Sequence, residues 1–170
     1  TVKPDYLFKE KRLSDLPLTE KRCVLITAHR RENIGRPLEN ICQAVKRLAE
    51  TYTDMIFVYP LHLNPKIRNT AVPILENVAN VCLMPPIDVE DMHNLLTRCF
   101  LVMTDSGGLQ EEAPACGVPV LVLRTQTERP EAVAAGTVKV AGVRQEDIVR
   151  EAANLIECGT QYEKMARAVN

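Results

Sequence analysis

Short apolar runs alternate along this chain with segments in which apolar residues recur at helical spacing. The runs are bounded by prolines, glycines and clusters of polar residues. Such runs are typical of strands that are buried on both faces of a parallel sheet. The predicted strands cover residues 23–28, 55–61, 81–84, 99–103, 119–123 and 137–140.

Apolar residues spaced three and four apart predict the helices between these strands. In the first helix the apolar positions from Leu38 to Leu48 share one face, and Pro37 suits its first turn. Pro73 is expected to kink or shorten the second helix, and Asp88 is a suitable N-cap for the third. The predicted helices cover residues 37–49, 65–75, 88–96, 108–116, 128–135, 145–156 and 161–168.

This alternation predicts an α/β fold, a Rossmann-like parallel sheet with helices on both faces. No internal repeat, low-complexity segment or interdomain linker divides the 170 residues, so we expect a single domain. Ligands of such sheets bind beyond the carboxyl ends of the strands. Polar segments follow four of the predicted strands, and one crevice could gather all four: HRREN, HLNP, TDSGG and RTQTERPE.

The composition of the chain argues against several classes of protein. A net charge of −1, 4% aromatic residues and the absence of Trp argue against a nucleic-acid-binding surface. No apolar run approaches the roughly 18 residues of a membrane span, and the charged N-terminal segment has no signal-peptide core, so we expect a cytoplasmic protein.

The six cysteines lack the spacing of a metal site, and several lie in apolar runs. We therefore expect small buried side chains in a reducing compartment, rather than disulfides or metal ligands.

The segment TDSGGLQEEAP combines accessible backbone with carboxylates. Gly107 and Gly108 open a helix directly after a strand, where N–H groups without side chains can approach a ligand closely. The start of a helix carries partial positive charge, and the Ser106 hydroxyl can donate to the same ligand oxygens. This arrangement predicts a phosphate site.

Two acidic residues, Glu111 and Glu112, lie one turn into the same helix. A carboxylate there can accept hydrogen bonds from a ribose diol, so the whole segment suits a nucleoside diphosphate. The structural alternative is that Ser106 caps the helix while the acidic residues only complement its dipole. Leu109 stands where a capping box needs Glu or Gln, which leaves that alternative incomplete.

Histidines and arginines follow two other strands. His29 in HRREN, with Arg30 and Arg31, is a candidate to stabilise charge that develops on phosphate. His62 in HLNP is a second candidate, and a hydrogen-bonded loop histidine is an equal alternative. His93 lies within a helical pattern, so we expect a structural or half-exposed side chain.

Arg129 follows the fifth predicted strand, in TERPE. Pro130 suits the first position of the next helix, so the guanidinium of Arg129 could point into the crevice. Alternatively, Arg129 pairs with Glu128 or Glu131 at the surface.

Four segments together resemble one enzyme family. TAHRREN, YPLHLNP, TDSGGLQEEAP and TERPEAVAAGT are similar, in order and spacing from about residue 24 to residue 142, to the non-hydrolysing bacterial UDP-N-acetylglucosamine 2-epimerases. The resemblance implies the C-terminal half of a GT-B-type fold, with residues 1–170 as one nucleotide-binding domain. It also implies a fragment that is inactive alone, without the family's N-terminal domain, its proton-transfer residues and its final helix.

The family reaction interconverts UDP-GlcNAc and UDP-ManNAc by eliminating UDP and adding it back. The resemblance therefore implies an isomerase without cofactor or metal, whose partners are UDP and UDP-N-acetylhexosamine. It also implies a homodimer for the full-length parent, while composition and hydropathy lead us to expect no nucleic acid or membrane partner.

The resemblance also implies roles for particular residues. His29 would be the catalytic residue that meets the leaving diphosphate. Glu112 would accept the ribose hydroxyls, and Met92 stands where some relatives place a Phe against the uracil. His62 and Arg30 are candidates for an allosteric UDP-GlcNAc site. The full substrate-binding set is Ser106, Gly107, Gly108, Glu112, Arg129 and Met92.

Two other functions remain alternatives. A GT-B glycosyltransferase domain shares a glutamate-bearing helix, but seldom HRREN together with HLNP and TERPE. A non-catalytic sugar-nucleotide sensor would bind UDP-GlcNAc without turnover. Products of the full-length protein would discriminate the three functions: UDP-ManNAc, free UDP with a glycoside, or no product.

Overall fold

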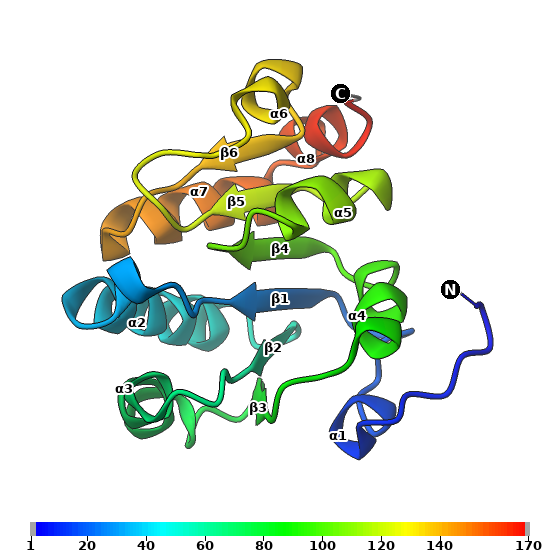
Figure 1. Cartoon of the computed structure of the whole chain (residues 1–170). Coiled ribbons are helices and arrows are strands. Elements are labelled where there is room, and N and C mark those ends of the chain that lie inside the picture. Colours follow the sequence, from blue (N-terminus) through cyan, green and yellow to red (C-terminus); the bar gives the residue numbers. More distant parts are fainter. Residues whose placement is uncertain (1–2, 169–170) are drawn as a thin grey trace.

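Six parallel strands form the centre of the molecule in the order β3-β2-β1-β4-β5-β6 (Figure 1). The strands of this computed structural model, which describes residues 3–168, are β1 (Cys23–Thr27), β2 (Ile56–Pro60), β3 (Val81–Met84), β4 (Leu101–Thr104), β5 (Val120–Val122) and β6 (Val138–Val140). The chain builds one side of the sheet as far as β3 and then crosses to pair β4 with β1. The predicted parallel α/β fold is confirmed.

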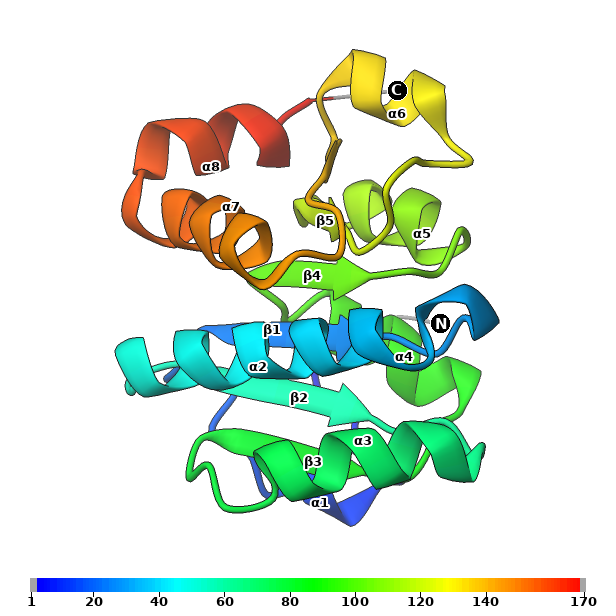
Figure 2. The same ribbon diagram turned by 90° about the vertical axis from the view of Figure 1, so that its left-hand side faces the viewer.

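Helices cover both faces of the sheet. Figure 2 looks onto the face covered by α2, α3 and α7, whereas α4, α5 and α6 pack on the other face. The helices are α1 (Lys11–Ser14), α2 (Arg36–Thr51), α3 (Pro65–Leu75), α4 (Val89–Leu96), α5 (Leu109–Ala115), α6 (Pro130–Ala135), α7 (Gln145–Glu157) and α8 (Gly159–Ala166), with a 3-10 turn η1 (Arg31–Asn33). Because both faces are covered, strand residues are apolar on both sides, which explains the continuous apolar runs.

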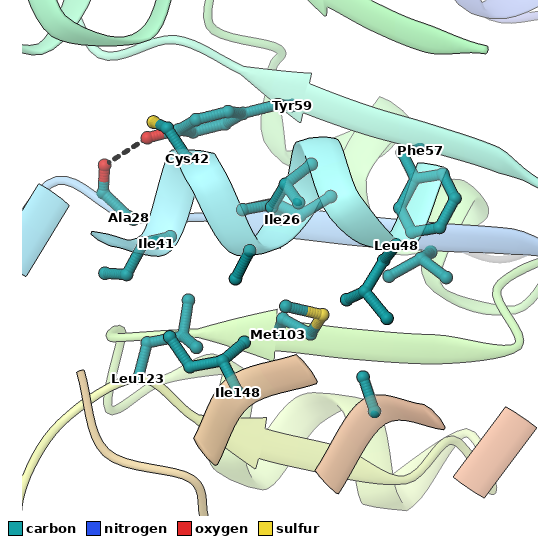
Figure 3. Close-up of a cluster of buried hydrophobic side chains, with 14 of the residues drawn as sticks. Ile26, Ala28, Ile41, Cys42, Leu48, Phe57, Tyr59, Met103, Leu123 and Ile148 are labelled. Carbon is teal, nitrogen blue, oxygen red and sulfur yellow. Dashed lines mark hydrogen bonds between the residues drawn. The ribbon is translucent and has the colours of Figure 1, made fainter. Parts of the chain in front are cut away.

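The larger core lies between the sheet and the helices α2, α3 and α7 (Figure 3). Ile26, Phe57 and Met103 point from three neighbouring strands toward Leu48 of α2 and Ile148 of α7 (Figure 3). Each buried apolar side chain of this size contributes about 1.5–3 kcal/mol of transfer free energy. This core holds the strand ends, and therefore the loops that follow them, in fixed relative positions.

Local signals in the sequence explain several helix ends. Asp88 accepts a hydrogen bond from the Asp91 N–H at 2.8 Å, so the predicted N-cap of α4 is confirmed. Gly117, with a φ of +74°, follows α5 where the chain must turn back into β5. Pro73 does not shorten α3, because it lies in the last turn and the helix ends at Leu75, as predicted. The kink stays a prediction.

Several predicted boundaries differ from the observed ones, among them the start of β4, which is Leu101 and not Cys99. Helix α6 begins at Pro130 and not at residue 128, because Arg129 precedes a proline and adopts φ −125° and ψ 64° outside the helix. Helix α8 begins at Gly159, two residues before the predicted start. Residues 1, 2, 169 and 170 of the predicted single domain lie outside the described residues.

The N-terminal segment contains the short helix α1, which the apolar pattern did not predict. Leu13 is its one buried residue. The segment is fastened to α4 by Asp91, a nearly fully buried carboxylate that accepts the N–H groups of Lys9 at 3.0 Å and Glu10 at 2.9 Å. The Tyr6 hydroxyl also donates to Asp91 at 2.6 Å. The segment's fold therefore depends on a contact more than 80 residues away in the sequence.

Cys23, Cys42 and Cys99 are buried, as expected, and Cys82 and Cys158 are half-buried, but Cys116 is exposed and the expectation was wrong for it. Cys116 follows α5, and its N–H bonds back to Ala113 at the molecular surface. Burial raises the pKa of the Cys42 thiol to about 12, so this thiol is protonated near neutral pH. Within residues 3–168, no helix has the length and apolar character that crossing a membrane requires.

Candidate functional site

A cavity of about 300 Å³ opens at the carboxyl ends of the central strands. It lies beside β1 and β4, the neighbours between which the strand order reverses, where open α/β sheets bind their ligands. Its lining residues are Thr27, His29, Pro60, Leu61, His62, Pro86, Ile87, Met92, Ser106, Gly108, Leu109 and Glu112. Three of the four predicted polar segments meet here, but the segment after β5 does not line the cavity.

A buried carboxylate holds His29 at the mouth of this cavity. Asp105, directly after β4, is fully buried and accepts the backbone N–H of His29 at 3.0 Å and of Arg30 at 2.9 Å. Asn33 Nδ2 donates to the same carboxylate at 3.0 Å and to the Leu123 carbonyl at 3.0 Å. The sequence analysis missed Asp105 and Asn33, although each lies inside a motif that it singled out, TDSGG and HRREN.

The imidazole of His29 stacks on that of His62. The ring centroids are 5.5 Å apart and the planes differ by 10°. The Asn64 N–H donates to His62 Nδ1 at 3.1 Å, which leaves Nε2 of His62 as the nitrogen that carries the proton in the neutral ring. His62 therefore lies in the same cavity as His29, and its assignment to a second site stays a prediction.

Ser106 and Gly108 line the cavity at the start of α5. The Ser106 N–H donates to Thr104 Oγ1 at 2.9 Å, while Gly108 occupies the N-cap position without a side-chain capping bond. Within the described part of the chain, the Ser106 hydroxyl thus makes no capping bond, and the structural alternative for Ser106 was wrong. The first N–H groups of a helix have no partner inside it, so these donors remain for a ligand.

Gly107 has a different neighbourhood from Gly108. It does not line the cavity, and a Cβ built on it would lie 2.9 Å from Glu128 Oε2. A Cβ built on Gly108 would lie 3.8 Å from Glu112 Oε1 and 3.9 Å from Ser106 Oγ, both cavity residues. The absence of a side chain at Gly107 therefore leaves room for the loop before α6. Its predicted phosphate contact stays a prediction.

Glu112 and Met92 line the cavity from α5 and α4. The carboxylate of Glu112 is about half exposed, and its Oε2 lies 3.9 Å from Nε2 of His93. His93 is half-exposed, as expected, but this proximity to a site carboxylate was not predicted. A protonated His93 would attract the Glu112 carboxylate and bias its position.

Arg129 lies outside the cavity and pairs with Glu111, with Nε 2.8 Å from Oε1. The prediction that Arg129 pairs with Glu128 or Glu131 was therefore wrong. The reason is tertiary, because the start of α5 lies beside the loop before α6. The predicted place of Arg129 near a nucleotide stays a prediction.

Arg30 belongs to a group of four charges that joins the loops after β1 and β5. Arg30 lies 3.0 Å from Glu32 and 3.0 Å from Glu128, and Arg124 lies 3.0 Å from Glu32 and 2.7 Å from Glu128. The hydrogen bond from Arg124 and the charge of Arg30 hold the pKa of Glu128 below its ordinary value. The charge of Arg30 is thus balanced by carboxylates, and its second-site role also stays a prediction.

Known proteins match this chain over nearly all of its length. A family model described as UDP-N-acetylglucosamine 2-epimerase matches residues 2–170. The chain belongs to this family. The UDP-N-acetylglucosamine 2-epimerase of Campylobacter jejuni is 42% identical to it over 174 residues, which cover 99% of this chain and 45% of that relative.

Solved structures of the UDP-N-acetylglucosamine 2-epimerase family share the fold closely. The S. aureus MnaA-UDP co-structure superimposes with a TM-score of 0.92 at 46% identity, and covers 100% of this chain and 46% of that one. UDP-GlcNAc 2-epimerase from Neisseria meningitidis, bound to UDP-GlcNAc, superimposes with a TM-score of 0.90 at 44% identity. The match covers 95% of this chain and 44% of that one. The chain thus spans less than half the length of these relatives.

The same fold occurs outside the epimerase family. The C-terminal domain of a glycosyl transferase group 1 protein from Francisella tularensis matches with a TM-score of 0.64 at 14% identity. At that identity the likeness concerns the fold alone. It agrees with the predicted GT-B-type fold.

Proposed function

We propose that this chain binds UDP as the nucleotide-binding half of a UDP-GlcNAc 2-epimerase. The observation that carries the proposal is the cavity between β1 and β4, which gathers His29, Ser106, Gly108, Met92 and Glu112. Its volume of about 300 Å³ is at the lower end of the range of small-molecule sites, as expected of a cleft whose other wall is a second domain. Solved relatives that bind UDP or UDP-GlcNAc support the choice of ligand.

Each cavity residue matches one part of UDP. Ser106 and the N–H of Gly108 bind the phosphates, because they offer donors at the positive end of a helix. Glu112, one turn further along α5, accepts hydrogen bonds from the ribose hydroxyls. Met92 lies against the uracil as a polarizable apolar surface. His29 meets the diphosphate where its negative charge grows as it leaves.

The reaction needs groups that exchange the C2 proton, and within residues 3–168 both carboxylates at the start of α5 have other roles. A base removes the C2 proton of UDP-GlcNAc, and the C1–O bond breaks with its electron pair passing to the β-phosphate oxygen of UDP. The resulting 2-acetamidoglucal regains a proton on the opposite face of C2 while UDP adds back at C1, so atoms and charge balance. Glu111 is paired with Arg129, and Glu112 is committed to the ribose. The C2 proton is therefore moved by a second domain, while this domain binds UDP and stabilises its charge.

Calorimetry with UDP, UMP and uridine tests the nucleotide site. We expect the 170-residue chain to bind UDP weakly, UMP more weakly and uridine least, because most contacts at the start of α5 are to phosphate. Equal affinities for UDP and uridine would show that the phosphate assignment is wrong.

Turnover tests the division of labour between domains. We expect no C2 epimerisation or deuterium incorporation when the chain alone is incubated with UDP-GlcNAc in deuterated water. The two-domain protein, which we also propose to be a homodimer, should produce UDP-ManNAc. Free UDP with a glycoside would indicate a glycosyltransferase, and binding without any product would indicate a sensor.

A further inference from the structure

Asp105 is a fully buried carboxylate that neither the proposed reaction nor the sequence motifs account for. Carboxylates are almost never fully buried unless they are paired or fully hydrogen-bonded. Its hydrogen-bond donors all come from the loop after β1, which is 72 to 76 residues away in the sequence. The carboxylate therefore joins two strand ends that face the same cavity.

One oxygen of this carboxylate receives most of the hydrogen bonds. The His29 N–H, the Arg30 N–H and the Asn33 amide all donate to Oδ2, at 3.0, 2.9 and 3.0 Å, and the His29 N–H also lies 3.3 Å from Oδ1. An Asn at position 105 would keep one oxygen for these donors, but its NH₂ group would replace Oδ1 and face the His29 N–H, donor against donor. A neutral amide oxygen also accepts more weakly than a carboxylate, so the bonds that hold the loop would weaken.

The position of this loop decides where His29 lies. Asp105 Oδ1 is 3.8 Å from His29 Nδ1, and the His29 ring stacks on His62 at the cavity wall. Ser106 directly follows Asp105 in the chain, so one buried group fixes both the histidine and the serine of the cavity. Asn33 extends the same cluster to the Leu123 carbonyl after β5.

We propose that Asp105 is a positioning residue that holds His29 in register with the bound diphosphate. The role of His29 in this inference rests on the proposed function. The geometry of the loop is independent of that function. Asp105 acts through the His29 backbone and ring and need not touch the substrate. Small displacements of a catalytic group lower the rate of reaction more than they lower affinity.

The chain contains a matched control for this proposal. Asp91 is also a nearly fully buried carboxylate, and it also accepts two consecutive backbone N–H groups and one side-chain donor. It fastens the N-terminal segment to α4 and does not line the cavity. Asp91→Asn should thus disturb the fold as much as Asp105→Asn does, without moving His29.

The test compares Asp105→Asn, Asn33→Ala and Asp91→Asn by NMR of the chain. The chain has three histidines, so the ring protons of His29 and His62 can be assigned individually. We expect the nuclear Overhauser contact between the two rings to be lost in Asp105→Asn, weakened in Asn33→Ala and retained in Asp91→Asn. In the two-domain enzyme, Asp105→Asn should lower kcat by about tenfold or more while KM changes by less than about threefold.

Each outcome decides the proposal. An unchanged ring contact in Asp105→Asn, or an equal loss in Asp91→Asn, overturns the positioning role. A lost contact with an unchanged kcat overturns any role in the reaction. If Asp105→Asn does not fold, Asn33→Ala decides in its place: a weakened contact with a lowered kcat supports the proposal, and no change in either overturns it. If the wild-type enzyme neither binds UDP nor epimerises, the proposed function fails, and the NMR comparison still decides whether Asp105 positions His29.

Discussion

The two sides of the first turn of α5 carry the same kinds of residue but have opposite surroundings. On one side, Gly108 and Glu112 face the cavity, and within residues 3–168 the ion-pair partner of Glu112 is His93, at 3.9 Å. On the other side, Gly107 faces the loop before α6, and Glu111 pairs with Arg129 at 2.8 Å. One side is open to a ligand, and the other is closed by side chains of the protein itself.

This difference shows why residue type and spacing alone do not identify a binding group. Glu111 and Glu112 are adjacent in the sequence and lie about 100° apart around the helix. That rotation sends one carboxylate to the cavity and the other to an arginine. A carboxylate that already balances a guanidinium has less to offer a ribose than one that is half exposed and free of a strong ion pair.

The largest effect should come from Glu112→Gln. A carboxylate that bridges two ribose hydroxyls makes charge-assisted hydrogen bonds, each about 1.5–3 kcal/mol, so UDP affinity should fall about tenfold or more. Affinity for a 2′,3′-dideoxy analogue should change little, because the analogue lacks both hydroxyls. Calorimetry with the two ligands measures the ratio of the affinity for UDP to the affinity for the dideoxy analogue.

Glu111→Gln is the control for this experiment. It removes the ion pair with Arg129, so we expect a lower melting temperature and an unchanged ratio of the two affinities. If Glu112→Gln changes only stability, its carboxylate has a dipole role, worth about 0.3–1 kcal/mol, and the ribose role is refuted.

A smaller effect should distinguish the two glycines. Gly108 has helical φ and ψ of −63° and −42°, so Gly108→Ala is conformationally allowed and should preserve or slightly raise stability. Its new Cβ lies among cavity residues, so UDP affinity should fall several-fold. Gly107→Ala places a Cβ 2.9 Å from Glu128 Oε2 and should instead lower stability as that side chain moves. A greater loss of UDP affinity in Gly107→Ala than in Gly108→Ala would reverse the two assignments.

The smallest expected effect is a change in melting temperature at low pH. It concerns Glu128, on the side of α5 that side chains of the protein close. The pKa of Glu128 is lowered in the folded state by the hydrogen bond from Arg124 and the charge of Arg30. A lowered pKa contributes stability above the unfolded value of about 4.3, and this contribution is lost as the pH falls through the folded value. The difference in melting temperature between wild type and Glu128→Gln should be small at pH 7 and should vanish toward pH 3. A difference that grows on acidification would contradict this ion pairing.

The secondary structure could be predicted because it depends on local patterns. Continuous apolar runs, helical spacing and the Asp88 N-cap are properties of neighbouring residues, and the structure has six parallel strands where such runs occur. The short helix α1 was missed because it is held by a contact with Asp91, which no local window contains. The start of α6 was misplaced because Pro130 changes the backbone of Arg129.

The sequence by itself determined the fold class, the family and three of the segments that meet at the cavity, because strand ends in a parallel sheet share one edge. Only the tertiary structure decided which charged side chains at that edge are free. Arg129 and Glu111 neutralise each other, Arg30 is balanced by Glu32 and Glu128, and Asp105 is buried under the loop of His29. The physical reason is that ion pairs and buried hydrogen bonds depend on distances of a few ångströms between residues far apart in the chain, and no spacing along the sequence encodes those distances.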